Sequence, residues 1–304
     1  MTTPPSLDQD LDLAIERLGS RARASLWWTH VPALAGERLG VIGSFDAQSE
    51  EACRALLDQA CERLAREWCT LAVGPMDGNT WRRYRLVTDP GTEPPFFLEP
   101  ANPPAWPVWW RAAGFGALAE YYSTATSDLT TRDGRLSAVQ ERMRTLGVTL
   151  RFFRAGEFEA ELRRIYEVSV VSFQENYLYT PLPEASFVGQ YRALEGKLRP
   201  ELVLLAEHAG KPVGYVFATP DFAEMQRGAP LRTVIVKTLA VLPGRTYAGL
   251  GALLLGEVHA SAAKLGFTRA IHALMHASNR SRNLSAHYAD TLRRYTLFSR
   301  RLLP

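Results

Sequence analysis

The sequence predicts an α/β protein built on a mixed β-sheet, and two patterns support that prediction. The first is a strand–helix–strand unit, which occurs at residues 38–74 and again, more weakly matched, at 233–277. The second is a hairpin at residues 201–220, where two apolar runs flank the Ala209-Gly210 pair. The spacing of the two units fits an internal duplication and a chance recurrence equally well. With 304 residues, the chain has room for two domains of ordinary size.

The composition is that of a globular protein. Hydrophobic residues make up 46% of the chain and charged residues 22%. No stretch approaches the roughly 20 apolar residues that a membrane-spanning helix needs, and the acidic first segment lacks the apolar core of an export signal. We therefore expect a cytoplasmic protein with no membrane partner.

Three cysteines lie close together, in one predicted helix and the strand that follows it. They are Cys53, Cys61 and Cys69, and each is eight residues from the next. An odd number at this spacing suits buried small side chains better than a disulfide framework or a metal site. We accordingly expect no metal.

The charge is distributed unevenly along the chain. Residues 231–304 contain eleven Lys and Arg against two acidic residues, a net charge of +9, whereas the remainder has 24 basic and 30 acidic residues, a net charge of −6. No carboxylate occurs between Glu224 and Glu257. A concentrated positive field attracts an anion. Because the basic residues interrupt an apolar strand–helix–strand pattern, a compact polyanionic small molecule suits them better than a nucleic acid.

The first half reads as alternating helices and strands followed by a loop. Expected elements are a helix closed at Gly19, a strand, a helix capped by Ser49 and a strand, at residues 6–19, 38–45, 50–67 and 69–74. Residues 89–110 are too rich in proline for regular structure and lead into a short helix before Gly114. Residues 124–147 are polar and are expected to form a helical link between the halves.

The second half is predicted to hold a longer series of elements. Besides the hairpin, these are strands at 148–155, 232–243, 267–277 and 291–303, and helices at 158–174, 184–198, 249–265 and 278–289. The turn between the strand ending at Pro243 and the helix beginning at Gly249 is rich in small residues. Amides of such a turn, together with the positive end of the helix dipole, form a cradle for an anion. The alternative is a plain connection in which the glycines serve packing.

The segment "VLPGRTYAGLGALLL" resembles the acetyl-CoA pyrophosphate loop of the GCN5-related N-acetyltransferase (GNAT) superfamily. That loop has the form Gln/Arg-x-x-Gly-x-Gly/Ala, and Thr246, Gly249 and Gly251 fall on it, with Thr246 in place of the usual first residue and Arg245 beside it. The element order from residue 148 onward is also similar to the family's. The resemblance implies an acyl-CoA N-acyltransferase fold at residues 148–304.

The first half resembles the superfamily more weakly, through "EPPFFLEPANPPAWPVWWRAAGFGALAEYYS" and "GPMDGNTW". No glycine loop occurs between Phe45 and Glu50, which indicates a truncated copy unable to hold coenzyme A. The expected organisation is therefore a tandem one. It consists of a degenerate GNAT-like domain at 1–130, a linker helix at 131–147 and an acetyl-CoA-binding domain at 148–304.

The resemblance implies which residues would hold acetyl-CoA. Backbone groups of the fourth strand of the domain bind the pantetheine arm, the loop amides bind the pyrophosphate, and an asparagine ends the next strand beside the cofactor. The corresponding residues here are Leu239, Ala240, Val241, Arg245, Thr246, Tyr247, Ala248, Gly249, Leu250, Gly251, Ala252 and Asn279.

The resemblance assigns catalytic residues less sharply, because direct attack of an amine on the thioester needs no nucleophilic side chain. Tyr288 is the candidate acid, although it lies two residues beyond the family's usual position and could equally be a packed tyrosine. The expected strand carboxylate is missing, so Glu175 is the candidate base. His272 and His276 are also candidates for the base; they share one face of their strand if no bulge intervenes, and the alternative is that each is a packed or surface histidine. Tyr177 and Tyr179 either shape the acceptor site or pack.

The leading hypothesis is an N-acetyltransferase that transfers an acetyl group from acetyl-CoA to a small-molecule or aminoacyl amine. The alternative is a non-catalytic acyl-CoA-binding regulatory or sensor protein, suggested by the missing strand carboxylate. Nucleic-acid binding by the basic region is a third hypothesis, and no groove-reading module supports it. The chain is expected to be a monomer or homodimer. The sequence does not identify the acceptor.

Overall fold

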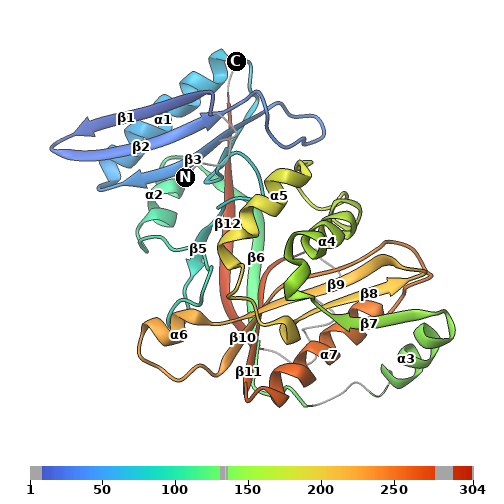
Figure 1. The fold of residues 1–304 in the computed structure, drawn as a ribbon. Helices are drawn as coiled ribbons and strands as arrows, with labels where there is room; N and C mark the ends of the chain where they lie inside the picture. The colour runs from blue at the N-terminus through green and yellow to red at the C-terminus, as the bar shows by residue number, and fades with distance from the viewer. Residues whose placement is uncertain (1–8, 131–133, 135, 278–289, 303–304) are drawn as a thin grey trace.

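The computed structural model describes residues 9–130, 134, 136–277 and 290–302. The strands of these residues form one mixed sheet in the order β1-β2-β3-β4-β12-β6-β11-β10-β9-β8-β7, with β5 pairing beside β12. Figure 1 shows two lobes joined by the long strands β6 and β12. The mixed α/β class predicted from the sequence is confirmed.

The first half of the chain supplies the upper lobe of Figure 1 and part of the junction. Its elements are β1 (Leu11–Arg17), β2 (Ser20–Trp27), β3 (Leu39–Ala47), α1 (Glu50–Arg66), β4 (Leu71–Gly74), β5 (Leu86–Asp89), α2 (Trp106–Ala112) and β6 (Gly116–Thr126). As predicted, Ser49 caps α1, and its side chain accepts a hydrogen bond from the Ala52 amide.

The second half supplies the lower lobe and the last strand. Its elements are α3 (Leu136–Thr145), β7 (Val148–Phe152), α4 (Phe158–Ser172), α5 (Glu184–Tyr191), β8 (Val203–His208), β9 (Lys211–Pro220), α6 (Phe222–Gln226), β10 (Thr233–Val241), α7 (Leu250–Lys264), β11 (Arg269–His276) and β12 (Asp290–Arg301), with short 3₁₀ turns at Ala155–Glu157, Arg192–Leu194 and Pro200–Leu202. The predicted hairpin turn is confirmed, because Ala209 and Gly210 both have positive φ.

The helix predicted at residues 6–19 is wrong over the described residues. Residues from Leu11 onward form the hairpin β1–β2, and Leu18 and Gly19 make its turn with φ of 49° and 77°. Leu11, Leu13 and Ile15 alternate with more exposed residues and pack on the core, which is the period of a strand. Gly19 therefore closes a hairpin and not a helix.

The helical link predicted at residues 124–147 is also partly wrong. Residues 124–126 end β6, and the helix α3 covers only Leu136–Thr145. β6 is held by long-range pairing with β11 on one side and β12 on the other. The proposed division at residues 130 and 148 stays a prediction.

The sheet has an internal symmetry about its centre, between β12 and β6. On each side an antiparallel hairpin leads to a parallel strand pair joined by a helix: β3–α1–β4 on one side and β10–α7–β11 on the other. The last strand of each half pairs with the opposite half, since β12 pairs with β4 and β6 pairs with β11. The strand–helix–strand repeat seen in the sequence is therefore present in the topology.

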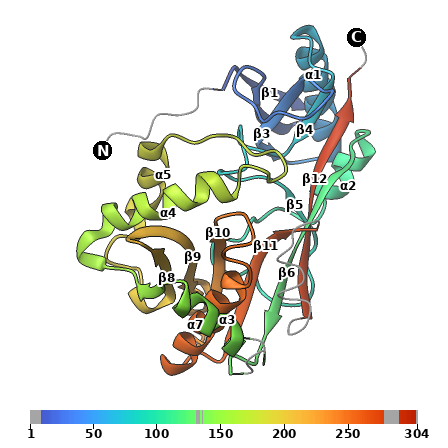
Figure 2. The same cartoon turned by 90° about the vertical axis from the view of Figure 1, so that its right-hand side faces the viewer.

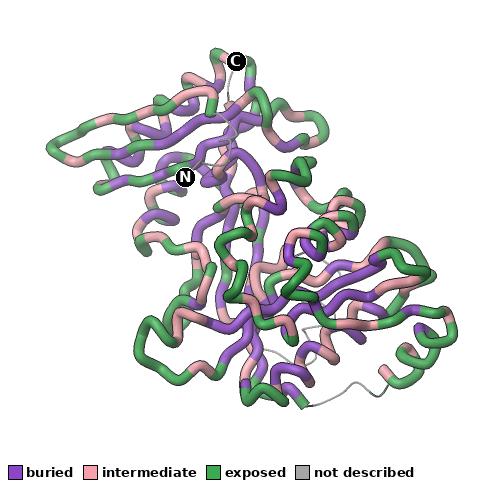
Figure 3. Tube along the Cα trace, viewed as in Figure 1, coloured by how far each residue is buried: buried purple, intermediate pink, exposed green. Residues whose placement is uncertain are grey.

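Helices cover both faces of the second half of the sheet, and Figure 2 shows α4 and α5 on one side with α3 and α7 on the other. Side chains of α7 pack with Val234 and Val236 of β10, whereas α4 and α5 pack with Tyr215 and Phe217 of β9. Figure 3 shows that the buried residues follow the sheet and its junction, while α3 and the hairpin ends are largely exposed. Cys53, Cys61 and Cys69 are buried in the first half, as predicted.

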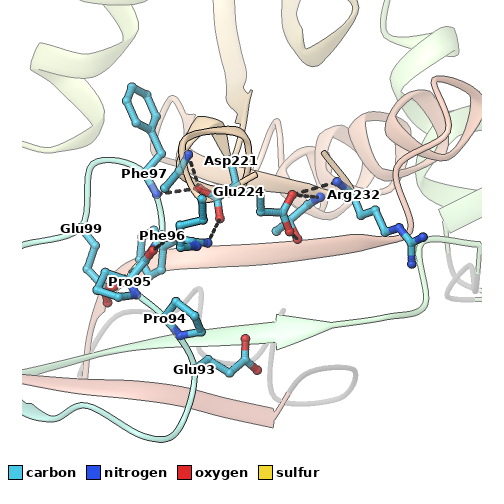
Figure 4. A network of polar contacts seen from close by, with 12 residues as sticks. Glu93, Pro94, Pro95, Phe96, Phe97, Glu99, Asp221, Glu224 and Arg232 are labelled. Carbon is cyan, nitrogen blue, oxygen red and sulfur yellow. Dashed lines mark hydrogen bonds and ion pairs between the residues drawn. The ribbon is translucent and has the colours of Figure 1, made fainter. Parts of the chain in front are cut away.

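A proline-rich segment of the first half, residues 93–99, anchors the second half (Figure 4). The Phe97 amide donates to Asp221 at 2.7 Å, and Arg227 donates to the Pro95 carbonyl at 2.6 Å. Glu93 pairs with Arg269 of β11 at 2.6 Å. Phe96 packs on β10 and β11, so this segment fixes the strands from which the candidate site is built.

Candidate functional site: a fork between two parallel strands

Strands β10 and β11 separate part-way along their length. They pair in parallel only from Thr233 with Arg269 to Val236 with His272, although β10 continues to Val241 and β11 to His276. β10 has a bulge directly after the last pair, between Val236 and Thr238. We call the opening beyond this point the β10–β11 fork.

The fork exposes an unpaired strand edge. The Leu242 amide donates to the Val213 carbonyl at 2.9 Å, so by the alternation of an antiparallel ladder the backbone groups of Leu239 and Val241 point away from β9. No described strand pairs with that edge. Ser172 Oγ donates to the Val241 carbonyl at 3.0 Å and takes one of its groups. The remaining groups suit an extended ligand that adds as a further strand.

The small-residue turn between β10 and α7 lies at the mouth of the fork. Gly249 caps α7 with a left-handed φ of 83°, which glycine adopts without strain. Among the described residues, the amides of Gly251 and Ala252 have no backbone acceptor, whereas those of Leu250 and Leu253 bond within the turn. The first turn of α7 contains no acidic residue. The helix dipole and these amides therefore remain available to an anion.

The other predicted loop residues fall into two groups. Arg245, Thr246 and Ala248 are exposed on the turn. Tyr247 directs its hydroxyl to His208 Nδ1 at 2.9 Å, so this side chain anchors the turn to the β8–β9 hairpin. Leu250 and Ala240 are buried in the cores on opposite faces of the sheet, which leaves only their backbone for a ligand.

Helix α3 contributes a residue that the sequence alone did not single out. Arg142 donates a hydrogen bond to the Ala248 carbonyl, and Val139 lies against Gly249, where an added Cβ would come within 2.9 Å of it. A shallow cavity of about 620 Å³ borders Arg142 along α3. A guanidinium thus stands beside the turn amides and adds to their attraction for an anion. Only tertiary packing reveals this contact, because α3 lies about a hundred residues earlier in the chain.

The predicted catalytic residues are not brought together by the described structure. Glu175 is exposed in the loop after α4. Tyr288 and Asn279 lie outside the described residues. Their roles stay predictions.

The two histidines of β11 do not share a face, because a bulge intervenes. The pairing with β6 shifts between His272 and Met275, and Leu274 has a φ of 61°. His272 is buried against α7, with its Nε2 3.0 Å from His259 Nε2. His276 instead packs on the opposite face, edge-on to Tyr121 and tilted against Tyr177.

The first half of the chain reaches the loop between α4 and α5, near the open face of the fork. Trp81 Nε1 donates to the Thr180 carbonyl at 2.7 Å, and the Trp81 ring packs against Phe173 and Tyr179. Thr80 contacts the Leu178 carbonyl. The segment "GPMDGNTW" therefore holds in place the loop that carries Tyr177 and Tyr179.

The corresponding fork in the first half is closed by the chain itself. β3 and β4 pair from Leu39 to Val41, and beyond that point the Met76 amide donates to the Ile42 carbonyl at 2.8 Å. The Met76 side chain is fully buried there. Asp77 Oδ1 accepts a hydrogen bond from the Ser44 amide at 2.6 Å. Backbone and side-chain groups of residues 76–77 thus occupy an edge like the one that is open in the second half.

This arrangement of sheet, fork and turn is the acyl-CoA N-acyltransferase fold. No protein-family model and no curated protein matches the sequence. A GCN5-related N-acetyltransferase from Sphaerobacter thermophilus superposes with a TM-score of 0.53 at 13% identity, covering 93% of this chain and 77% of that one. A tandem GNAT protein from the clavulanic acid biosynthesis pathway superposes at 0.51 and 14% identity, covering 99% and 85%.

A third similar structure is the glucosamine N-acetyltransferase region of a fungal multi-domain GH3 β-N-acetylglucosaminidase, with a TM-score of 0.55 and 12% identity. The match covers 91% of this chain and 31% of that protein. The resemblance drawn from the sequence, to the GNAT fold in its tandem form, is confirmed at the level of the fold. Within the described residues, no helix is long and apolar enough to span a membrane, and no group of side chains could hold a metal ion.

Proposed function

We propose that the chain is an acyl-CoA-dependent N-acyltransferase that uses acetyl-CoA and acts in the β10–β11 fork. The observation that carries the proposal is the unpaired edge of β10 leading to a helix N-terminus free of acidic residues. Such an edge suits a pantetheine arm, and such a terminus suits a pyrophosphate. Arg142 adds a positive charge at the same end.

The space around the first turn of α7 supports the proposal. A Cβ built at Gly251 has no neighbour closer than 3.8 Å, and those neighbours are Leu239 and Val241 of the open edge. Acetyl-CoA would supply the thioester. The chain would contribute alignment: the edge of Leu239 and Val241 would direct the thioester into the fork, and orientation of this kind lowers the barrier to direct attack by an amine.

The proposal is tested by calorimetric titration of acetyl-CoA and free CoA into the wild type, Gly251→Glu and Gly251→Ala. A glutamate at this position interacts favourably with the helix dipole and so should not unfold the protein, but it repels a pyrophosphate. We expect micromolar binding by the wild type and Gly251→Ala, and a loss of at least about 100-fold in Gly251→Glu, equivalent to about 2.7 kcal/mol. Absence of wild-type binding would refute the proposal.

The second candidate, a non-catalytic acyl-CoA sensor, is kept because β10 carries no carboxylate in the described structure and presents Lys237 at its bulge. Release of free thiol from acetyl-CoA, measured across a panel of amines, separates the two. Turnover of any amine above the rate of hydrolysis supports the enzyme. Tight binding with no turnover, accompanied by a change of assembly state on binding, supports the sensor.

A further inference from the structure

Lys237 occupies the branch point of the fork. It is the extra residue of the β10 bulge, one position beyond the last pair with β11. Its Nζ lies 5.0 Å from the centre of the Tyr191 ring, on the face covered by α4 and α5. The side chain is exposed, yet desolvation by the surrounding protein lowers its pKa. Lys237 is thus an amine at the branch point that solvent can reach, with one aromatic ring beside it.

A second cation stands on the other side of the fork. Arg85 is 6% exposed, and its guanidinium lies 4.0 Å and 4.2 Å from the ring centres of Tyr84 and Tyr121. One of its nitrogens is 3.5 Å from the carbonyl of Leu274, which follows the last pair on β11. Its Nε has no hydrogen-bond partner in the described structure.

Neither cation pairs with a carboxylate of the described residues, and this sets the buried Arg85 apart from two other arginines that are mostly shielded from solvent. Arg151 is nearly buried and pairs with Glu161 at 2.6 Å and with Glu207. Arg293 is buried beside Glu99, 2.9 Å away. Arg85 is buried, and a buried charge without a counter-ion is costly, so its charge beside the fork is best explained by a counter-ion that arrives with a ligand.

The corresponding fork in the first half of the chain has an acidic side chain of the protein at its bulge. There the strand β3 also carries a bulge beyond its last pair with β4, and its Ser44 amide bonds to the Asp77 carboxylate. In that copy, an acidic side chain of the protein lies at the bulge. In the described part of the second copy the bulge carries a lysine and no carboxylate.

We infer that the acceptor is an amine that also carries an anionic group, such as an amino acid or an amino phosphate ester, and that Lys237 binds this group. The inference deepens the proposed acyltransferase function and rests on it. The anion would lie on the α4 face of the fork, and Arg85, which precedes β5 and lies beside Leu274 of β11, would add positive potential from the other side. Lys237 therefore selects the substrate class.

The position of the cation also suits the chemistry. The acceptor nitrogen must be neutral to form its bond to the thioester carbonyl carbon as the carbon–sulfur bond breaks and the amine proton leaves to base or water. A nearby ammonium disfavours a second positive charge and so lowers the pKa of the acceptor amine. Binding the anion through Lys237 thus holds the acceptor and favours its reactive form.

The test is a set of matched acceptors assayed for thiol release with acetyl-CoA. Each proteinogenic amino acid is compared with its amide and its decarboxylated amine, and phosphoethanolamine with ethanolamine. The wild type, Lys237→Met, Lys237→Arg and the exposed control Lys197→Met are compared. Calorimetric binding of acetyl-CoA to each variant shows whether the fold and the cofactor site are intact.

We expect the wild type to prefer an anionic acceptor over its neutral counterpart by about 10- to 100-fold in kcat/KM, the range of a charge-assisted hydrogen bond. Lys237→Met should abolish that preference mainly through KM, Lys237→Arg should keep part of it, and Lys197→Met should match the wild type. The amino acid series tests whether the acceptor's anionic group is a carboxylate, and the phosphoethanolamine pair tests whether it is a phosphate. Equal rates for neutral and anionic acceptors, or no acylation of any anionic acceptor by a protein that binds acetyl-CoA, would overturn the inference. Failure to bind acetyl-CoA would instead refute the proposed function itself.

Discussion

The two strand–helix–strand units share a topology and differ at the helix terminus that faces each fork. Helix α1 begins with Ser49, whose side chain caps an amide, and has Glu50 and Glu51 in its first turn. Helix α7 begins with Gly249, has no side-chain cap and has no acid in its first turn. In the first unit the chain satisfies its own helix dipole, whereas in the second the described residues supply neither a side-chain cap nor an acidic residue to do so.

The comparison shows that a few residues are enough to cover the exposed strand edge of a fork. The fork of the first half is filled by residues 76–77, and its helix has a capping serine and two acidic residues; the fork of the second half has none of these in the described structure. The architecture of the sheet supplies the edge in both halves. A few local residues then decide whether the edge belongs to the core or to a site.

The largest effect is expected from glycines placed in the two forks. A Cβ at Gly43 would overlap the Met76 carbonyl, which is backbone and cannot turn aside, whereas a Cβ at Gly251 meets nothing closer than 3.8 Å. Gly43→Ala should lower the free energy of unfolding by about 3 kcal/mol, through overpacking. Gly251→Ala should raise it by about 0.5–1 kcal/mol. Urea unfolding followed by circular dichroism measures both, and similar values for the two variants would show that the forks are equally filled.

A pH-dependent difference is expected because only the second unit has histidines between its helix and sheet, His272 buried and His259 half-buried. Desolvation lowers the pKa of His259 to about 4, with Asp128 opposing, and that of His272 to about 3, with His259 adding to the effect. Below pH 6.5 the unfolded chain binds protons that the folded pair does not, so stability falls as pH falls.

Between pH 6.5 and pH 5 each histidine should account for a loss of about 2 kcal/mol. His259→Gln removes one titrating group and can still bond to His272, so the slope of unfolding free energy against pH should fall by about half. An unchanged slope in His259→Gln would contradict the prediction.

The smallest effect concerns the helix caps. Ser49→Ala should cost about 1 kcal/mol, because the Ala52 amide loses its acceptor. Gly249→Ser should also cost about 1–2 kcal/mol although serine is a favoured cap, since φ is 83° and the new Cβ lies 2.9 Å from Val139. Thermal unfolding of the two variants tests this. A stabilising Gly249→Ser would show that α7 is an ordinary capped helix.

Much of the second half could be predicted from the sequence, because its signals are local. The Ala209-Gly210 turn, the glycines before α7 and the apolar face of that helix fix their elements within a few residues. The candidate loop was found for the same reason. Asn279 and Tyr288 lie outside the described residues, so the prediction of their roles is still to be tested.

By itself, the sequence determined the class of fold, the cap of α1 and the turn that precedes α7, since each depends on neighbours in the chain. The tertiary structure decided the rest. β6 was missed because its pairing partners are β11 and β12, more than a hundred residues away. Lys237 and Arg85 were missed because their place on either side of the fork is visible only in the tertiary structure. The same holds for the observation that no carboxylate of the described residues pairs with them. The physical reason is the same in each case: non-local pairing and burial set these features, and neither is encoded in a short run of residues.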